Sequence, residues 1–158
     1  MSLYTPFSNY IEVNQEYRQV VADEEPSFWD SREVEYTHYR QQWNLAHENP
    51  SFTPKVPLCV TIDASSLCNL RCLGCHQSIE GAVKDAGQLK SDDALRIIDQ
   101  CAEIGVPSIS FAWKGEPTLN KYLPEMVAYC RVKGILETRT VTNCLSPHKG
   151  IYEELCEA

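Results

Sequence analysis

The sequence predicts an α/β fold with a parallel sheet, and three observations support that prediction. Three short stretches between residues 58 and 143 have the alternation or the β-branched content of strands. Two stretches with helical periodicity separate them, and Gly or Pro residues stand near the boundaries. Strands that alternate with helices of this length form βαβ units, whose strands run parallel. We therefore expect a sheet that is buried on both faces.

The composition sets the class of protein. The chain has 158 residues, of which 43% are hydrophobic and 23% charged, and its formal net charge is −8. These values are typical of a globular protein with one core. No apolar run reaches the roughly 18 residues of a membrane span, and the first residues lack a signal-peptide pattern, so we expect a cytoplasmic protein. The acidic balance argues against nucleic acid or a membrane as partner.

The first 55 residues differ in character from residues 56–158. They are polar, aromatic and poor in glycine, and we expect them to form an extension that packs on the main domain. Ser31 to Glu48 has a weak helical period, with apolar residues scattered over two faces. That weakness favours an irregular layer over a helix in this segment.

The first strand and the first helix of the main domain have clear signals. Residues 58–63 alternate with a period of two, which predicts a strand. Ser91, interpreted as an N-cap, is followed by the acidic Asp92 and Asp93, and the helical pattern then continues to Gly105. Acidic residues in the first turn and glycine after the last turn are typical of a helix with these bounds.

The second βα unit repeats this order. Residues 109–113 predict a strand whose aromatic residues, Phe111 and Trp113, we expect in the core. A helix follows with Pro124 in its first turn and Gly134 at its end. Residues 135–143, rich in Thr and Val, predict the third strand.

A third helix begins at Gly150, and the sequence stops about two turns later. A parallel sheet of three strands would leave a long unpaired edge, which complete domains usually cover. We therefore expect the chain to be the front part of a longer protein.

The cysteines point to metal chemistry. A chain without an export signal is expected to keep its eight cysteines as free thiols. Three of them, Cys68, Cys72 and Cys75, fall within eight residues after the first strand, with CxxxCxxC spacing. Thiolates are the soft ligands that iron–sulfur clusters and zinc favour, so this triplet predicts one metal centre. The other five are interpreted as small buried residues: Cys59, Cys101, Cys130, Cys144 and Cys156.

Other uses of the triplet stay open at this point. A closed zinc site needs a fourth ligand, and His76, directly after Cys75, is poorly placed to supply it. With a more distant ligand, the chain would be a non-enzymatic zinc-binding interaction module that uses its N-terminal aromatic segment as contact surface. Residues 72–76 also have the CxxCH spacing of haem attachment, although that chemistry accompanies export. Cys72 and Cys75 also have the CxxC spacing of a redox dithiol. That motif normally lies at the start of a helix, whereas this loop continues through residues 79–81.

Together with two later segments, the triplet resembles the radical S-adenosylmethionine (radical SAM) superfamily. Lys114–Pro117, after the second strand, is similar to the family's Gly-Gly-Glu-Pro motif, and Thr142-Asn143, after the third strand, is similar to its Thr-Asn-Gly motif. All three segments follow consecutive strands, where barrel-type α/β folds place their active sites. The chain has Gly74 where the family commonly has an aromatic residue, and Lys114 and Cys144 where it has glycines.

The resemblance implies a partial (β/α)6 barrel of the TIM type, of which this chain holds about the first three βα units. It implies that the cysteine triplet ligates a [4Fe–4S] cluster and that Gly115, Glu116 and Asn143 contact S-adenosylmethionine. The implied oxidoreductase activity cleaves this cofactor to a 5′-deoxyadenosyl radical, which abstracts hydrogen from a small-molecule or peptide substrate. An external electron donor of the flavodoxin or ferredoxin type would reduce the cluster. Residues 39–63 have a looser likeness to the branch that carries a C-terminal SPASM or twitch domain.

Overall fold

The computed structural model describes residues 28–79 and 86–158, with side chains from residue 32 onward. It divides into two compact units, and the second, His38–Ala158, holds the sheet and every predicted motif. Of the first unit, the described part is the beginning of one helix. In chain order, the elements are α2 (Phe28–Glu48), β1 (Val60–Ile62), α3 (Ser91–Glu103), β2 (Ser108–Phe111), α4 (Leu123–Val132), β3 (Glu137–Thr140) and α5 (Ile151–Glu157), with 3-10 turns at His76–Ser78 and Pro117–Leu119.

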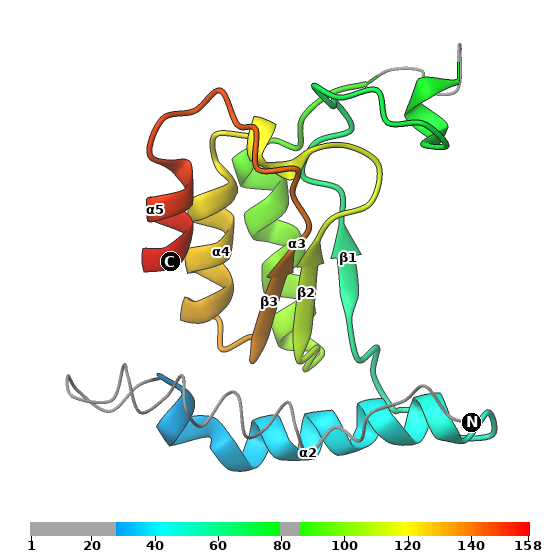
Figure 1. Cartoon of the computed structure of the whole chain (residues 1–158). Coiled ribbons are helices and arrows are strands. Elements are labelled where there is room, and N and C mark those ends of the chain that lie inside the picture. Colours follow the sequence, from blue (N-terminus) through cyan, green and yellow to red (C-terminus); the bar gives the residue numbers. More distant parts are fainter. Residues whose placement is uncertain (1–27, 80–85) are drawn as a thin grey trace. The chain divides into compact units, whose positions relative to one another are not determined.

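The three strands form one parallel sheet in the order β1-β2-β3 (Figure 1). Val60 of β1 aligns with Ile109 of β2, which in turn aligns with Thr138 of β3. The helix α3 connects β1 to β2, α4 connects β2 to β3, and α5 follows β3. The predicted α/β fold with a parallel sheet is confirmed, because the chain contains three consecutive βα units.

The core lies between the sheet and the helices. Ile62, Ile109 and Phe111 come from the strands, and Ile98 and Met126 come from α3 and α4. The helices stand beside one another, α3 against α4 and α4 against α5 (Figure 1). Burying a side chain of this size stabilises the fold by about 1.5–3 kcal/mol. This packing fixes the sheet register, since a shift of one residue would turn the buried strand residues to the other face.

Several predicted boundaries differ from the structure, including those of all three strands, and local contacts explain two of them. Lys90 is the N-cap residue of α3 and Ser91 its first residue, so the N-cap prediction for Ser91 was wrong. The Ser91 hydroxyl donates to Glu125 at 2.8 Å instead. The strand β1 ends at Ile62 because the chain then pairs with a different segment, and the Leu89 N–H donates to the Ala64 carbonyl at 3.0 Å.

The helix α2 shows that an irregular layer was the wrong prediction for residues 31–48. Its period is weak because few of its side chains are buried. Tyr39 is 3% exposed, whereas Leu45 is 46% exposed. The Tyr39 hydroxyl donates to the Glu137 carboxylate at 2.7 Å, and an Arg40 nitrogen lies 3.7 Å from the same carboxylate. Residues 1–27 of the expected extension lie outside the described residues, and the boundary at residue 55 stays a prediction.

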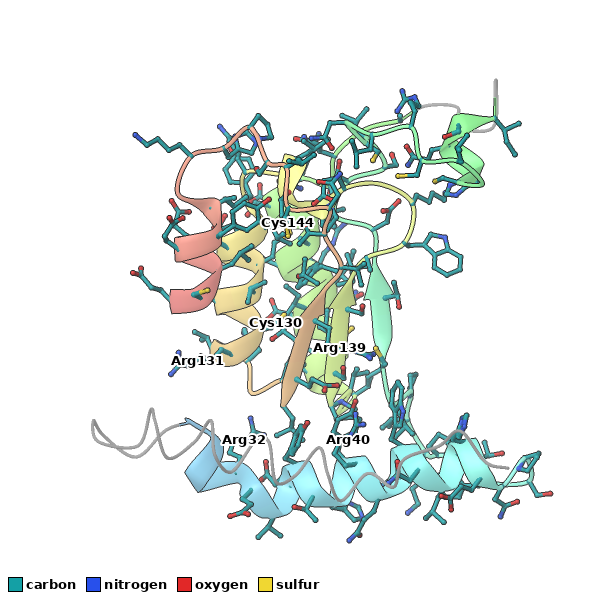
Figure 2. All side chains as sticks on the ribbon, viewed as in Figure 1. Arg32, Arg40, Cys130, Arg131, Arg139 and Cys144 are labelled. Atoms are coloured by element: carbon teal, nitrogen blue, oxygen red, sulfur yellow. The ribbon has the colours of Figure 1, made fainter. Side chains whose placement is uncertain are left out.

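Burial was predicted wrongly for Trp113 and for the exposed Cys144 and Cys156. Phe111 is fully buried as predicted, but Trp113 is 78% exposed with a positive φ of 129°. The strand ends at Phe111, so the alternation that would have turned Trp113 inward stops before it. Cys101 and Cys130 are buried as predicted, Cys59 is half-buried, and Cys144 and Cys156 are exposed. Figure 2 shows the difference, with Cys130 on α4 and Cys144 in the loop that follows β3.

No helix in the described ranges is both long and apolar enough to span a bilayer.

Candidate functional site

The three motif segments lie in the loops that follow β1, β2 and β3. Because the strands are parallel, these loops meet at one end of the sheet, the end to which the arrows in Figure 1 point. Residues 68–75 follow β1, residues 114–117 follow β2, and residues 142–143 follow β3. The fold therefore brings together segments that are far apart in the sequence.

The cysteine loop contains a tight turn. The Cys75 N–H donates to the Cys72 carbonyl at 3.2 Å, and Gly74 has a φ of 81°. A residue with a Cβ adopts this conformation only with strain, so the turn requires glycine where the family commonly has an aromatic residue. The Ser78 hydroxyl donates to the Cys72 carbonyl at 2.8 Å, and the Arg71 guanidinium donates to the Cys68 carbonyl at 3.0 Å.

The three thiols are free, with Cys72 exposed and Cys68 and Cys75 half-buried. In the described part of the chain, no three Cys, His, Asp or Glu side chains gather into a group that could hold a metal ion. The structure thus brings the three cysteines onto one loop without bringing their sulfurs to one point. The donor set nevertheless fits an iron–sulfur cluster, because three thiols on one accessible loop are soft ligands of the right kind. The Leu70 N–H lies 3.4 Å from the Cys68 sulfur, the kind of hydrogen bond that tunes such clusters.

Gly115 is required because the cysteine loop passes directly over it. A Cβ at this position would lie 2.1 Å from the Ser65 carbonyl oxygen and 2.3 Å from that of Leu67. Real Cβ atoms essentially never come within 3.0 Å of a heavy atom outside their own residue and its chain neighbours. The N–H of the next residue, Glu116, donates to the Leu67 carbonyl at 2.8 Å. This close approach pins the loop after β2 to the residue that precedes Cys68.

The Glu116 carboxylate is buried, with 3% of the residue exposed, and it accepts hydrogen bonds from two loops. Its Oε1 accepts from the hydroxyls of Thr118 at 2.7 Å and Thr142 at 2.6 Å, and from the Thr118 N–H at 3.1 Å. Its Oε2 accepts from the Asn143 N–H at 2.6 Å. Burial alone would raise the pKa of Glu116, but these hydrogen bonds outweigh it and lower the pKa below its ordinary value. The site therefore contains a buried carboxylate that is ionised at neutral pH.

Asn143 joins the loop after β3 to the cysteine loop. Its side-chain amide donates to Asn69 Oδ1 at 2.9 Å, and its Oδ1 accepts from the Leu145 N–H at 2.9 Å. Asn69 in turn donates to the Leu145 carbonyl. Cys144 has a φ of 60°, in the left-handed region that glycine adopts most readily. Its backbone is therefore the one expected of the family's glycine, although cysteine has a side chain.

Lys114 is accommodated without backbone strain. The φ angle of Lys114 is not positive, so this position does not need the glycine that the family has there. The Lys114 N–H lies 3.3 Å from Asp63 Oδ1, and its carbonyl accepts from the Gln77 side chain. These contacts attach the loop after β2 both to the end of β1 and to the 3-10 turn that follows the cysteines.

Asn120 is one of several buried polar residues that sequence reasoning missed, together with Thr118, which donates to Glu116. The Asn120 side-chain amide donates to the Ala64 carbonyl at 2.9 Å and to the Leu89 carbonyl at 2.8 Å, and its Oδ1 accepts from the Tyr122 N–H at 3.1 Å. The available signal was an asparagine shortly before a helix with proline in its first turn, which is a common helix-start pattern. Asn120 donates to two carbonyls outside the three-stranded sheet and so holds the start of the cysteine loop in place.

The fold and the site together define an α/β protein of βα units whose cysteine loop and two further loops interlock at the carboxyl end of a parallel sheet. The family model of the radical SAM superfamily matches residues 63–158, and the chain belongs to this superfamily. Members of the family are enzymes that bind a [4Fe–4S] cluster and S-adenosylmethionine.

Two curated relatives illustrate the range of the family. The chain is 38% identical to the Fe-coproporphyrin III synthase of Methanosarcina barkeri over 68 residues, and these aligned residues cover 43% of this chain and 16% of that protein. It is 32% identical to the PqqA peptide cyclase of Granulibacter bethesdensis over 107 residues, which cover 67% of this chain and 28% of that protein. The chain thus spans less than a third of the length of these relatives.

A solved structure shows the same fold. The crystal structure of BtrN in complex with AdoMet and 2-DOIA matches with a TM-score of 0.58 and 22% sequence identity, over 66% of this chain and 43% of that chain. The predicted partial (β/α)6 barrel is consistent with this match, and the present chain supplies three of its βα units.

Proposed function

We propose that this chain is the cluster-binding part of a radical SAM enzyme. Cys68, Cys72 and Cys75 would ligate three irons of a [4Fe–4S] cluster, and Gly115, Glu116 and Asn143 would form the surface that receives S-adenosylmethionine. The observation that supports this most directly is the hydrogen bonding among the three motif loops. Glu116 bonds through its N–H to Leu67, beside the cysteines, and through its carboxylate to Asn143.

The proposed roles follow from the chemistry of each side chain. When bound, the reduced cluster supplies the electron that cleaves the cofactor and releases the radical that abstracts hydrogen from the substrate. The three thiolates provide soft ligands, and the Leu70 N–H, 3.4 Å from the Cys68 sulfur, stabilises negative charge there. The ionised Glu116 gives the site a negative charge beside which a cationic amine is favoured. Gly115 allows the loop backbones to approach closely enough to form a continuous surface.

The substrate is proposed as a class only, a small molecule or a peptide. The relatives include a protein named as a porphyrin synthase and one named as a peptide cyclase, and their chains are much longer than this one. We further propose an oxidoreductase-type hydrogen abstraction, an external one-electron donor of the flavodoxin or ferredoxin type, and a cytoplasmic location, since the reducing cytosol would keep the thiols free.

The test is metal content followed by electron paramagnetic resonance. The chain would be reconstituted anaerobically with iron and sulfide, reduced with dithionite, and measured with and without S-adenosylmethionine. We expect several irons with acid-labile sulfide, and a cluster signal that shifts when the cofactor is added. The buried-cysteine variant C101A is the matched control and should keep the signal. A folded chain with one zinc and no cluster signal would instead support the zinc-binding module.

A further inference from the structure

Four protein donors already bond to the Glu116 carboxylate. An ionised carboxylate offers about four lone-pair sites. Oε1 has three donors, two from Thr118 and one from Thr142, and Oε2 has the Asn143 N–H at 2.6 Å. With 3% of the residue exposed, little of this carboxylate is accessible to a ligand. The side chain is therefore committed to contacts within the protein.

These contacts connect all three motif loops through one residue. The N–H of Glu116 holds Leu67 and hence the start of the cysteine loop, at 2.8 Å. Its carboxylate holds the backbone of Asn143, whose side chain reaches Asn69 inside the cysteine loop at 2.9 Å. Hydrogen bonds therefore link Leu67 to Glu116, Glu116 to Asn143, and Asn143 back to Asn69 in the cysteine loop.

We propose that Glu116 is a positioning residue that fixes the loop after β3 against the start of the cysteine loop, at Leu67 and Asn69, before any cofactor arrives. The cofactor then meets a preformed surface made of the backbone around Gly115 and of Asn143, and the carboxylate acts on it through Asn143. This inference deepens the proposed function, because it makes the part of Glu116 in the cofactor surface an indirect one, and it depends on that function only for the cofactor step. The preorganisation of the loops is a property of the chain alone.

The isosteric variant E116Q tests whether the carboxylate holds the loop after β3. A glutamine side chain has one oxygen and one NH2 group, and both carboxylate positions face donors in the native structure. Either orientation therefore sets an NH2 group against a donor and breaks at least one hydrogen bond. We expect hydrogen exchange of the Asn143 amide in the metal-free chain to become about tenfold faster or more.

The milder variant T142V distinguishes positioning from direct contact with the cofactor. It removes one donor to Oε1 and leaves the carboxylate in place. If Glu116 positions the loop, T142V speeds exchange at Asn143 and weakens binding of S-adenosylmethionine to the reconstituted chain, in the same direction as E116Q. If Glu116 contacts the cofactor directly, T142V leaves that affinity unchanged or increases it, because the carboxylate has lost a competitor.

Exchange would be followed by NMR or by mass spectrometry of the peptide that covers residues 142–146, and cofactor affinity by the shift of the cluster signal. E125Q is the matched control, because Glu125 accepts a hydrogen bond from Ser91 on the exposed surface of α4. Native exchange at Asn143 in both E116Q and T142V would overturn the inference. If E116Q does not fold, T142V alone decides. If the wild-type chain assembles no cluster, the proposed function fails, and the exchange measurement still tests the positioning role.

Discussion

Replacing Gly115 with alanine tests whether the loop after β2 and the cysteine loop are in direct backbone contact. The added Cβ would lie 2.1 Å from the Ser65 oxygen and 2.3 Å from the Leu67 oxygen, so these oxygens must retreat by about 0.9 and 0.7 Å to reach 3.0 Å. Both are backbone atoms, which cannot swing away as a flexible side chain can. Overpacking of this kind costs about 1–3 kcal/mol.

The displacement also breaks a hydrogen bond. Moving Leu67 lengthens its 2.8 Å bond from the Glu116 N–H, a loss of about 1 kcal/mol. We therefore expect G115A to lower the free energy of unfolding by about 2–4 kcal/mol, a large part of the 5–15 kcal/mol that holds a typical domain together. With an m-value near 2 kcal/mol/M, the urea midpoint would fall by about 1–2 M.

The assay is urea denaturation of the full chain followed by circular dichroism. G87A is the matched control, because a Cβ at Gly87 would meet nothing within 4 Å and the residue has no positive φ. We expect its midpoint to stay close to the wild-type value. A G115A chain as stable as G87A would refute the close approach of the two loops.

Three further predictions concern the cysteines and Tyr39. Alanine at Cys68, Cys72 or Cys75 should abolish iron binding. The control C130A should keep its iron and lose mainly packing contacts in the core. Equal loss of iron in C130A would contradict the assignment of the cysteine triplet as cluster ligands. Burial, with a smaller contribution from Cys101, raises the pKa of Cys130 to about 12. Iodoacetamide at pH 8 should therefore label the exposed Cys72 and Cys144 well before Cys130, as mass spectrometry of digests would show. Burial and the hydrogen bond to Glu137 raise the pKa of Tyr39 to about 12, against 10.0 unperturbed. The stabilisation from its neutral form is complete below pH 10 and is lost toward pH 12. The advantage of the wild type over Y39F in thermal unfolding should shrink across that range, and a constant gap would contradict it.

Local sequence patterns predicted the elements of the sheet and its two connecting helices because each has its own periodic signal. Phe111 and Ile109 alternate with polar neighbours, and α4 has Pro124 in its first turn and ends shortly before Gly134. The helix α2 had no comparable signal, since Tyr39 is 3% exposed while Val34 is 83% exposed. A helix whose buried contacts are few has little hydrophobic periodicity to detect.

The spacing of the motifs predicted that they share one end of the sheet, but not how they are joined. Parallel strands bring the loops together, and that much follows from topology. The bonds between them depend on individual polar residues in irregular segments, such as Asn69 with Asn143 and Gln77 with Lys114. Neither pair has a local pattern, because the partners lie 74 and 37 residues apart.

The segment Gly115-Glu116 shows why a short motif can carry long-range information. The glycine is required by two carbonyls about fifty residues earlier, at positions 65 and 67, and the glutamate is matched to donors more than twenty residues later, at positions 142 and 143. Neither requirement is visible in the segment itself. Removing the Thr142 hydroxyl should therefore disturb the site as a motif substitution would, whereas changing Lys114, whose contacts use only its backbone N–H and carbonyl, should disturb it less. The chemistry assigned to the motif thus depends first on assembly of the loops, and only then on the cofactor that they would receive.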